Sequence, residues 1–158
     1  MSYTQAPSLA NEEIEIFLQQ AKIARICTIN EDGTIHAVPV WFGYENGFFT
    51  IASPEKSRKT RNILKNPAVT LLIDVGEPIA RGVIVYGQAS VDFAKWDQKF
   101  QETSEKYMTK DAARKTVQEL NKLTKWAKVT IKTDRIASFV YEKDEKFGHA
   151  FRFASGGT

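Results

Sequence analysis

The sequence contains very few of the side chains that bind metals or form cross-links. It has one cysteine, Cys27, and two histidines, His36 and His149, in 158 residues. A single cysteine cannot form a disulfide within the chain, so the expected location is a reducing compartment, by default the cytoplasm. The three residues lie far apart and match no spacing typical of a metal site, so no metal centre is expected.

Long apolar runs and glycine-rich loops are also missing. No stretch approaches the roughly 18 apolar residues of a membrane span, and the start, MSYTQAPSLANEE, lacks the basic and apolar regions of a signal peptide. We therefore expect no membrane association. Neither a Walker loop nor a GxGxxG turn is present, which argues against a nucleoside triphosphate or a Rossmann-type cofactor.

Positive charge is concentrated in one segment, SPEKSRKTRNILKNP, at residues 53–67. It has five basic side chains and one acid, so its charge of +4 exceeds the +3 of the whole chain. The basic residues are Lys56, Arg58, Lys59, Arg61 and Lys65. Nucleic-acid binders usually spread basic residues over a face or stripe, whereas a local cluster suits a small anion. No nucleic-acid partner is expected.

The pattern of the chain predicts one mainly β domain over residues 1–158. Asn11 is a suitable N-cap for a helix over 11–21, and Asp-Gly and Asn-Gly turns separate three early strands. The predicted strands are 24–30, 35–44, 48–53, 68–74, 81–93, 127–132 and 135–141. A helix near Ser57 that ends before Pro67, a helical stretch over 94–125 and a flexible tail over about 144–158 complete the prediction.

Six or seven strands with tight turns favour a closed or nearly closed antiparallel barrel with flanking helices. Pro39 lies inside a predicted strand, so a sheet edge or a bulge is expected there. In the strand 68–74, Val69, Leu71 and Ile73 alternate with Thr70 and Leu72. One face of this strand can fill the barrel, and the other has to meet a helix or a second subunit.

The basic segment follows a strand at the start of a helix, where backbone N–H groups lack partners and the dipole is positive. Ser57, Arg58 and Lys59 occupy this first turn, and they are suitable donors to a phosphate group. The alternative is an ordinary solvated helix face, which accounts equally well for Arg61 and Lys65.

The stretch GFFTIASPEKSRKTRNILKNPAVTLLID resembles the core signature of the FMN-binding split-barrel family that includes pyridoxamine 5′-phosphate oxidase. The matching positions are Phe49-Thr50, Ser57-Arg58-Lys59, Asn66-Pro67 and Val69 to Ile73. The resemblance implies cofactor contacts at Phe49, Thr50, Ser57, Arg58 and Lys59. The hairpin EDGTIHAVPVWFGYENG resembles the one whose backbone lies along the isoalloxazine ring in that family. The resemblance implies flavin contacts at Val38, Val40 and Trp41, and it places His36 either at the phosphate end or toward solvent.

The resemblance also implies a homodimer with FMN between its subunits and hydride transfer to or from a small-molecule substrate. Near the C-terminus, Arg152 matches a flavin-contacting arginine, and Phe139 stands where the oxidase has a flavin-contacting tryptophan. Gly148 and Ala150 replace the arginine and histidine that bind its substrate, and Gly82 replaces a flavin-contacting glutamine. The resemblance therefore implies flavin binding without pyridoxamine phosphate oxidation, and no catalytic side chain is identified.

Two other functions stay open. Residues Lys59-Thr60-Arg61-Asn62-Ile63 resemble a form common in a sister branch that uses a deazaflavin coenzyme, which would make the protein a deazaflavin-dependent reductase. The loss of the substrate-binding side chains is also compatible with a non-catalytic module that binds flavin or heme.

Overall fold

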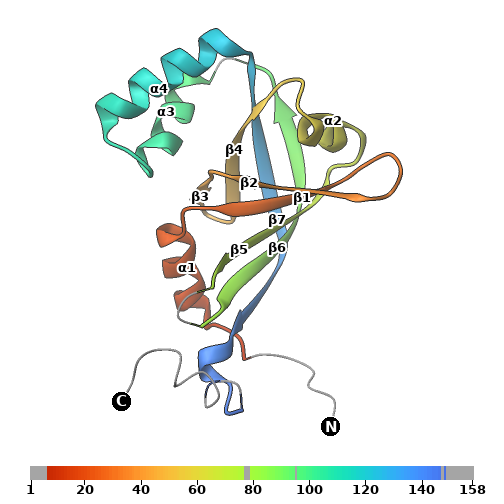
Figure 1. Cartoon of the computed structure of the whole chain (residues 1–158), viewed down its shortest axis with the longest axis vertical. Coiled ribbons are helices and arrows are strands. Elements are labelled where there is room, and N and C mark those ends of the chain that lie inside the picture. Colours follow the sequence, from red (N-terminus) through yellow and green to blue (C-terminus); the bar gives the residue numbers. More distant parts are fainter. Residues whose placement is uncertain (1–6, 77–78, 95, 147, 149–158) are drawn as a thin grey trace.

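The computed structural model describes residues 7–76, 79–94, 96–146 and 148 (Figure 1). It contains seven strands, four α-helices and one 3-10 helix. In chain order these are α1 (Asn11–Gln20), β1 (Ala24–Ile29), β2 (Ile35–Val40), β3 (Gly43–Glu45), β4 (Phe48–Pro54), α2 (Arg58–Lys65), β5 (Ala68–Val75), β6 (Arg81–Asp92), α3 (Asp97–Glu105), α4 (Lys110–Leu123), β7 (Trp126–Val140) and η1 (Tyr141–Lys143).

The strands form one antiparallel sheet in the order β2-β1-β5-β6-β7-β4-β3. β2 and β3 lie at opposite edges of this sheet, yet only Trp41 and Phe42 connect them. The sheet must therefore curl until its two edges are close, which is the geometry of a split barrel. The predicted mainly β fold, an antiparallel split barrel of six or seven strands with flanking helices, is confirmed.

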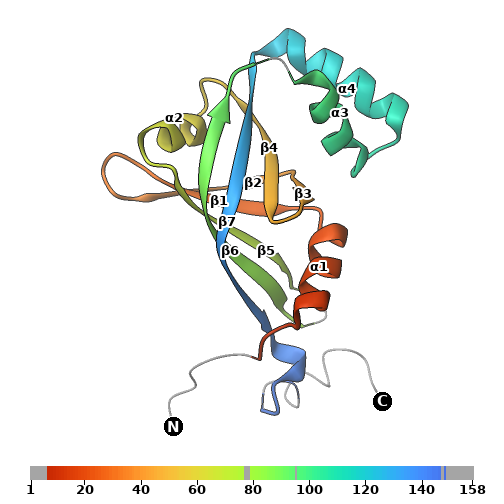
Figure 2. The ribbon, with the colours of Figure 1, turned by 180° about the vertical axis from the view of Figure 1, so that it is seen from behind.

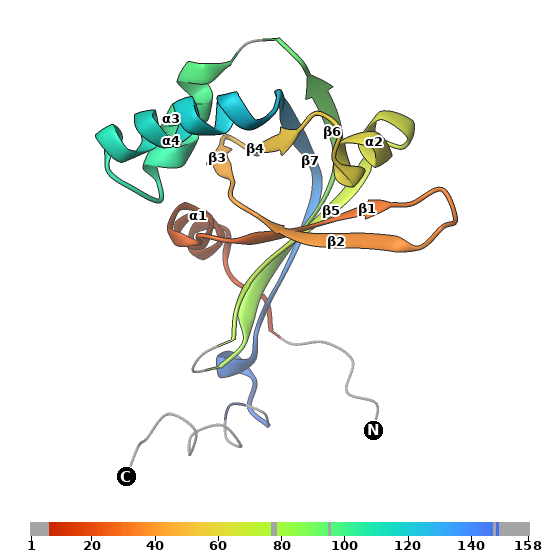
Figure 3. The same ribbon diagram turned by 45° about the horizontal axis from the view of Figure 1, so that its top comes forward.

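The core lies inside the curled sheet. Its largest fully buried side chains are Phe42, Phe49, Leu18, Ile26, Ile51, Leu71, Ile73 and Ile131, and those on the strands occupy alternate positions. Phe17 and Leu18 of α1 join the same core, so this helix closes one end of the barrel. α3 and α4 lie together beside β4 (Figures 2 and 3). Trp96, Phe100 and Val117 form a smaller cluster there, and Ala52 of β4 packs against it.

Several predicted boundaries were wrong. The predicted strand 35–44 is two strands, because the chain turns the corner of the barrel at Trp41 and Phe42. The predicted strands 127–132 and 135–141 are one strand, β7, whose register against β6 skips Asp134 at a bulge. The helical stretch 94–125 is two helices, α3 and α4, and α1 is capped by Ala10 rather than Asn11.

Other local predictions were correct. α2 has Ser57 as its N-cap and ends before Pro67. Pro39 lies in β2, an edge strand of the sheet, which is where proline is tolerated in a strand. Among the described residues, no helix has the length and apolar composition that crossing a bilayer requires.

Candidate functional site

The start of α2 is fastened to the end of β4 by a cluster of hydroxyl groups. The Thr60 N–H donates to Ser57 Oγ at 3.4 Å, which caps the helix, and the Thr60 hydroxyl donates to the Pro54 carbonyl at 3.0 Å. Ser53 Oγ lies 2.7 Å from Thr60 Oγ1 and 3.0 Å from Ser57 Oγ. Ser53 and Thr60 are fully buried, so the first turn of α2 has a fixed position.

A second contact fastens α2 to the β1–β2 hairpin. The Asn62 side-chain amide donates to Thr28 Oγ1 at 3.0 Å and to Asn30 Oδ1 at 2.9 Å. Thr28 is fully buried and lies opposite His36 in the β1–β2 register. His36 alternates with Val38 and Val40 on the inward face of β2, which is the more buried face. The backbone around the basic segment is thus held from two sides.

The basic residues of α2 differ in their surroundings. Lys65 forms an ion pair with Glu31 near the end of the helix. Arg58, Lys59 and Arg61 have no ion-pair partner among the described residues. Lys59 is half-buried, and this burial lowers its pKa. The first turn therefore holds positive charge that forms no ion pair with a carboxylate of the described chain.

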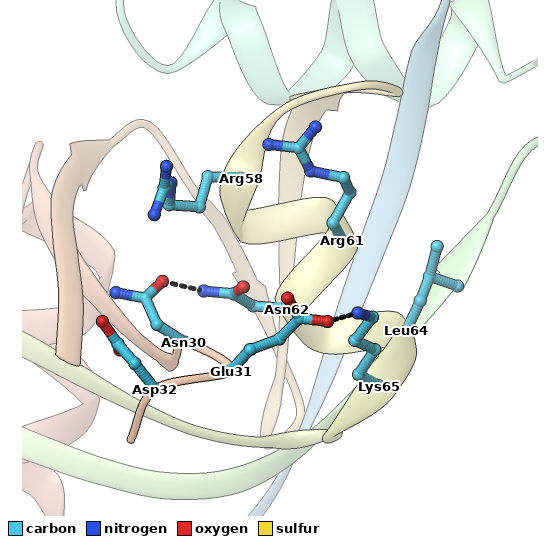
Figure 4. Close-up of a pocket in the computed structure, with 8 residues that line it drawn as sticks. All are labelled: Asn30, Glu31, Asp32, Arg58, Arg61, Asn62, Leu64 and Lys65. Atoms are coloured by element: carbon cyan, nitrogen blue, oxygen red, sulfur yellow. Dashed lines mark hydrogen bonds and ion pairs between the residues drawn. The ribbon is translucent and has the colours of Figure 1, made fainter. Parts of the chain in front are cut away.

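A pocket of about 590 Å³ lies between α2 and the β1–β2 turn (Figure 4). Its lining residues are Asn30, Glu31, Asp32, Arg58, Arg61, Asn62, Leu64 and Lys65. Arg58 and Arg61 extend from the same side of α2, whereas Lys59 is not among the lining residues. Hydrogen bonds from Thr34, and to a smaller extent the charge of Arg58, hold the pKa of Asp32 below its usual value.

The predicted flavin-contacting residues of β2 lie at the corner of the barrel. Val40 is buried and Val38 packs against the core, while Trp41 is 43% exposed. The Trp41 ring stacks on Tyr107, with centroids 4.4 Å apart and planes 6° apart. The Tyr107 hydroxyl accepts from the Phe42 N–H at 2.8 Å and donates to the Phe42 carbonyl at 3.0 Å. Sequence reasoning missed this role of Tyr107, because nothing local links it to residue 42.

The two candidate residues of β4 face opposite sides of the sheet. Phe49 is fully buried, and its ring packs against Tyr44 at 4.8 Å and Phe42 at 5.8 Å between centroids. This ring is part of the core. Thr50 points the other way, is half-buried and lines a pocket beside α3.

Phe139 lies far from α2 within one chain. Trp126 pairs with Pro54, next to the start of α2, and β7 then runs on to Phe139, which pairs with Gly82. At about 3.3 Å per residue the two ends of this run are roughly 40 Å apart along the strand. Figure 1 shows α2 and the η1 end of β7 at well-separated places. Arg152, His149 and Ala150 lie outside the described residues, and the Gly148 N–H donates to the Asp144 carbonyl at 2.8 Å.

The candidate residues thus form two groups. Those around α2, β2 and β4 are Val38, Val40, Trp41, Phe49, Thr50, Ser57, Arg58 and Lys59, and the other group is represented by Phe139. No cluster of His, Cys, Asp or Glu in the described part of the chain is arranged to hold a metal ion. The chemistry that remains is anion binding at α2 and flat, aromatic contacts at Trp41.

Solved structures with the same fold include proteins of several kinds. A conserved hypothetical protein, Rv2991, from Mycobacterium tuberculosis is 22% identical, with a TM-score of 0.70 over 88% of this chain and 89% of that one. HutZ, the heme storage protein from Vibrio cholerae, is 16% identical, with a TM-score of 0.66 over 80% and 92%. An F420 reductase is 19% identical, with a TM-score of 0.64 over 80% and 98%.

No curated protein sequence matches the chain. A family model does match it: the model described as pyridoxamine 5′-phosphate oxidase covers residues 10–133, which is most of the chain and includes α2 and the barrel corner. The chain therefore belongs to the pyridoxamine 5′-phosphate oxidase family.

Proposed function

We propose that this protein binds FMN and is a flavin-dependent oxidoreductase that acts on a small molecule. The observation that carries the proposal is that Arg58 and Lys59, in the first turn of α2, have no ion-pair partner among the described residues. A flavin supplies hydride or electron transfer when it is bound, and the protein holds and orients it. Family membership is consistent with such a cofactor but does not determine which one.

The first turn of α2 fits a phosphate group well. A phosphate monoester carries close to two negative charges, and Arg58 and Lys59 supply two positive ones at the positive end of a helix. A phosphate near Lys59 would also compensate for the burial that lowers its pKa. Ser57 contributes mainly by capping, because its hydroxyl already accepts the Thr60 N–H. Arg61 shares a pocket with Arg58 and joins the proposed set.

A homodimer would bring the two groups of candidate residues together. Phe139 lies roughly 40 Å along β7 from the residue beside α2, so the two cannot contact one flavin in the same chain. In a two-fold dimer the same pair of surfaces meets twice, and each α2 can lie beside the β7 end of the partner. We therefore propose two equivalent flavin sites between two subunits.

The substrate is proposed not to be pyridoxamine phosphate. Gly148 and Ala150 stand where the oxidase has an arginine and a histidine, and neither can form charge-assisted bonds to a substrate phosphate. No side chain of the described site is placed as an acid or base toward a defined substrate atom. We infer that this chain binds and orients the cofactor, and that protons come from solvent or from the substrate.

A deazaflavin coenzyme is the second candidate. The residues Lys59 to Ile63 resemble a form common among deazaflavin-binding proteins, and an F420 reductase shares the fold. The two coenzymes can both present a phosphate group to α2, so the site around Arg58 does not separate them.

The deciding experiment is reconstitution of the purified protein, followed by titration with FMN, FAD, coenzyme F420 and heme in separate samples. We expect the tightest binding with FMN and oxidation of NAD(P)H by the loaded protein. Tighter binding of F420 would replace the proposal by the deazaflavin reductase. Binding of FMN without turnover of any reduced nicotinamide or deazaflavin donor would leave a non-catalytic flavin module, and a preference for heme would overturn flavin binding.

A further inference from the structure

A second pocket, of about 690 Å³, lies on the outer side of the β3–β4 hairpin. One wall is the hairpin itself and the other is α3, and Gln19 of α1 contributes at the side. Figure 2 shows α3 beside the β3–β4 hairpin, away from α2. The volume is in the range of small-molecule sites, and apart from Thr50 the pocket contains none of the residues proposed to bind flavin.

The two walls come close at Gly43. A Cβ atom at this position would lie 3.3 Å from Thr103 Oγ1, so the absence of a side chain lets α3 approach the strand. The Thr103 hydroxyl donates to the Lys99 carbonyl at 2.9 Å within α3. The hydroxyl of Thr50 and the 46% exposed ring of Phe48 line the part of the pocket formed by β4. The pocket therefore combines an apolar surface with polar groups.

One end of the pocket is positive. Lys106, just past the end of α3, is half-buried and donates to the Leu18 carbonyl at 3.2 Å, with its ammonium 3.9 Å from the centroid of the Phe42 ring. No carboxylate of the described chain pairs with it, and Lys22 is a second positive charge nearby. Burial, with the charge of Lys22, lowers the pKa of Lys106 to about 8. This ammonium would be stabilised by an anion.

The opposite end is negative. Lys99 lies 3.5 Å from carboxylate oxygens of both Glu45 and Glu102, so the three side chains together carry one negative charge. Tyr44, which also lines the pocket, donates its hydroxyl to Glu15 at 2.7 Å, and this brings a further carboxylate close to the same wall.

The distance between the two ends limits the ligand. Lys99 and Lys106 are seven residues apart, which corresponds to roughly 10 Å along a helix. Glu102 is four residues from Lys106, roughly 6 Å along a helix, and Glu45 lies beside Lys99. With contacts of about 3 Å at each end, the charges of a bridging molecule would be roughly 4–10 Å apart. The contact of Lys106 with Leu18 uses one of three N–H donors and leaves others for a carboxylate.

We propose that this pocket binds a small zwitterion, an ω-amino acid in shape, with its carboxylate at Lys106 and its ammonium at Glu45 and Glu102. The methylene chain between the charges would lie along Thr50 and Phe48. Thr50 is also one of the residues predicted to contact the cofactor, so the further assignment of this ligand as the substrate rests on the proposed function. Binding itself does not.

The test is a calorimetric titration of the full-length protein, without added cofactor, with 6-aminohexanoate. Hexanoate and hexylamine are the matched probes that lack one charge each. We expect 6-aminohexanoate to bind at least about tenfold more tightly than either, because each probe loses one charge-assisted contact. Equal binding of the three probes would overturn the proposal.

Variants then identify the two ends of the site. Lys106→Met keeps the apolar stem on Phe42. It should reduce the affinity for 6-aminohexanoate to the affinity for hexylamine. The Glu45→Gln and Glu102→Gln double variant should reduce the affinity for 6-aminohexanoate to the affinity for hexanoate. This variant tests the site even if Lys106→Met fails to fold. Lys115→Met, at an exposed position of α4, is the control. An equal loss of affinity in the control would contradict the proposal. If the protein binds the zwitterion but fails to bind FMN, this proposal is supported and only the proposed function is disproved.

Discussion

Two lysines of the same helix show how strongly the neighbours of a residue decide its role. Lys65 is exposed, pairs with Glu31 and lies in the last turn of α2, where a cation suits the helix dipole. Lys59 lies in the first turn, is half-buried and has no carboxylate partner among the described residues. Charge counting along the sequence cannot distinguish them, but the structure gives them opposite environments.

This difference leads to a prediction for cofactor binding. Arg58→Ala and Lys59→Ala should each weaken FMN binding about 10- to 150-fold, because each removes a hydrogen bond to a charged group that contributes about 1.5–3 kcal/mol. Lys65→Ala should leave the affinity unchanged, since Glu31 already neutralises this residue. Quenching of flavin fluorescence on binding measures all three. If the three variants hold FMN equally well, the basic cluster is only a solvated face.

Lys106 leads to a prediction for stability against pH. Its pKa is about 8 in the folded protein and about 10.5 when exposed, so between these values the unfolded chain binds a proton that the native protein does not. Through this residue, the free energy of unfolding should therefore increase as the pH rises from 8 toward 10. Above pH 10 the raised pKa values of Tyr44 and Tyr107 act in the opposite direction.

Urea denaturation of the wild type and of Lys106→Met at pH 7, 8, 9 and 9.5 measures this contribution. Lys59 has a lowered pKa as well, but it is present in both proteins and its effect cancels in the difference. We expect the wild type to gain stability relative to the variant across this range. A difference that is independent of pH would show that Lys106 titrates like an exposed lysine.

At the level of elements, the sequence predicted which helices and strands are present better than it predicted where they begin and end. Residues 35–44 have continuous β character, and nothing local reveals that Trp41 and Phe42 turn the corner between the two edges of the sheet. The opposite error concerns β7, where Thr133-Asp134-Arg135 has the composition of a turn. Pairing with β6 carries the strand through that point as a bulge. Both errors arise because closure of the barrel is a long-range property.

The bulge makes Gly87 sensitive to substitution. A Cβ atom there would overlap the backbone carbonyl oxygen of Lys132, which cannot move without disturbing the β6–β7 pairing. Gly87→Ala should therefore destabilise the protein by about 1–3 kcal/mol in chemical denaturation. Gly76→Ala is the matched control, since nothing lies within 4 Å of its added methyl group. Similar losses in the two variants would show that the effect comes from the general properties of glycine and not from the bulge.

At the level of the whole molecule, the candidate site was predictable where it is local. The segment 48–59 predicts a strand, an N-cap and a helix start, and all three are present. The stack of Tyr107 on Trp41 and the place of Lys106 beside Phe42 join residues about 65 positions apart, so they depend on the folded topology. The same topology separates Phe139 from α2, although the sequence predicts flavin contacts for both.

That separation allows a direct test of the shared site. Two inactive proteins can be prepared, one with Arg58→Ala and Lys59→Ala, the other with Phe139→Ala and Arg152→Ala. Neither should retain FMN. When equal amounts are mixed and allowed to exchange subunits, half of the dimers are mixed, and each contains one site with both groups intact. About one quarter of all sites should then bind FMN, because a two-fold dimer pairs each α2 with the partner's β7. If mixing restores no flavin binding although light scattering shows exchanged dimers, each chain builds its site alone, and the proposed shared site is wrong.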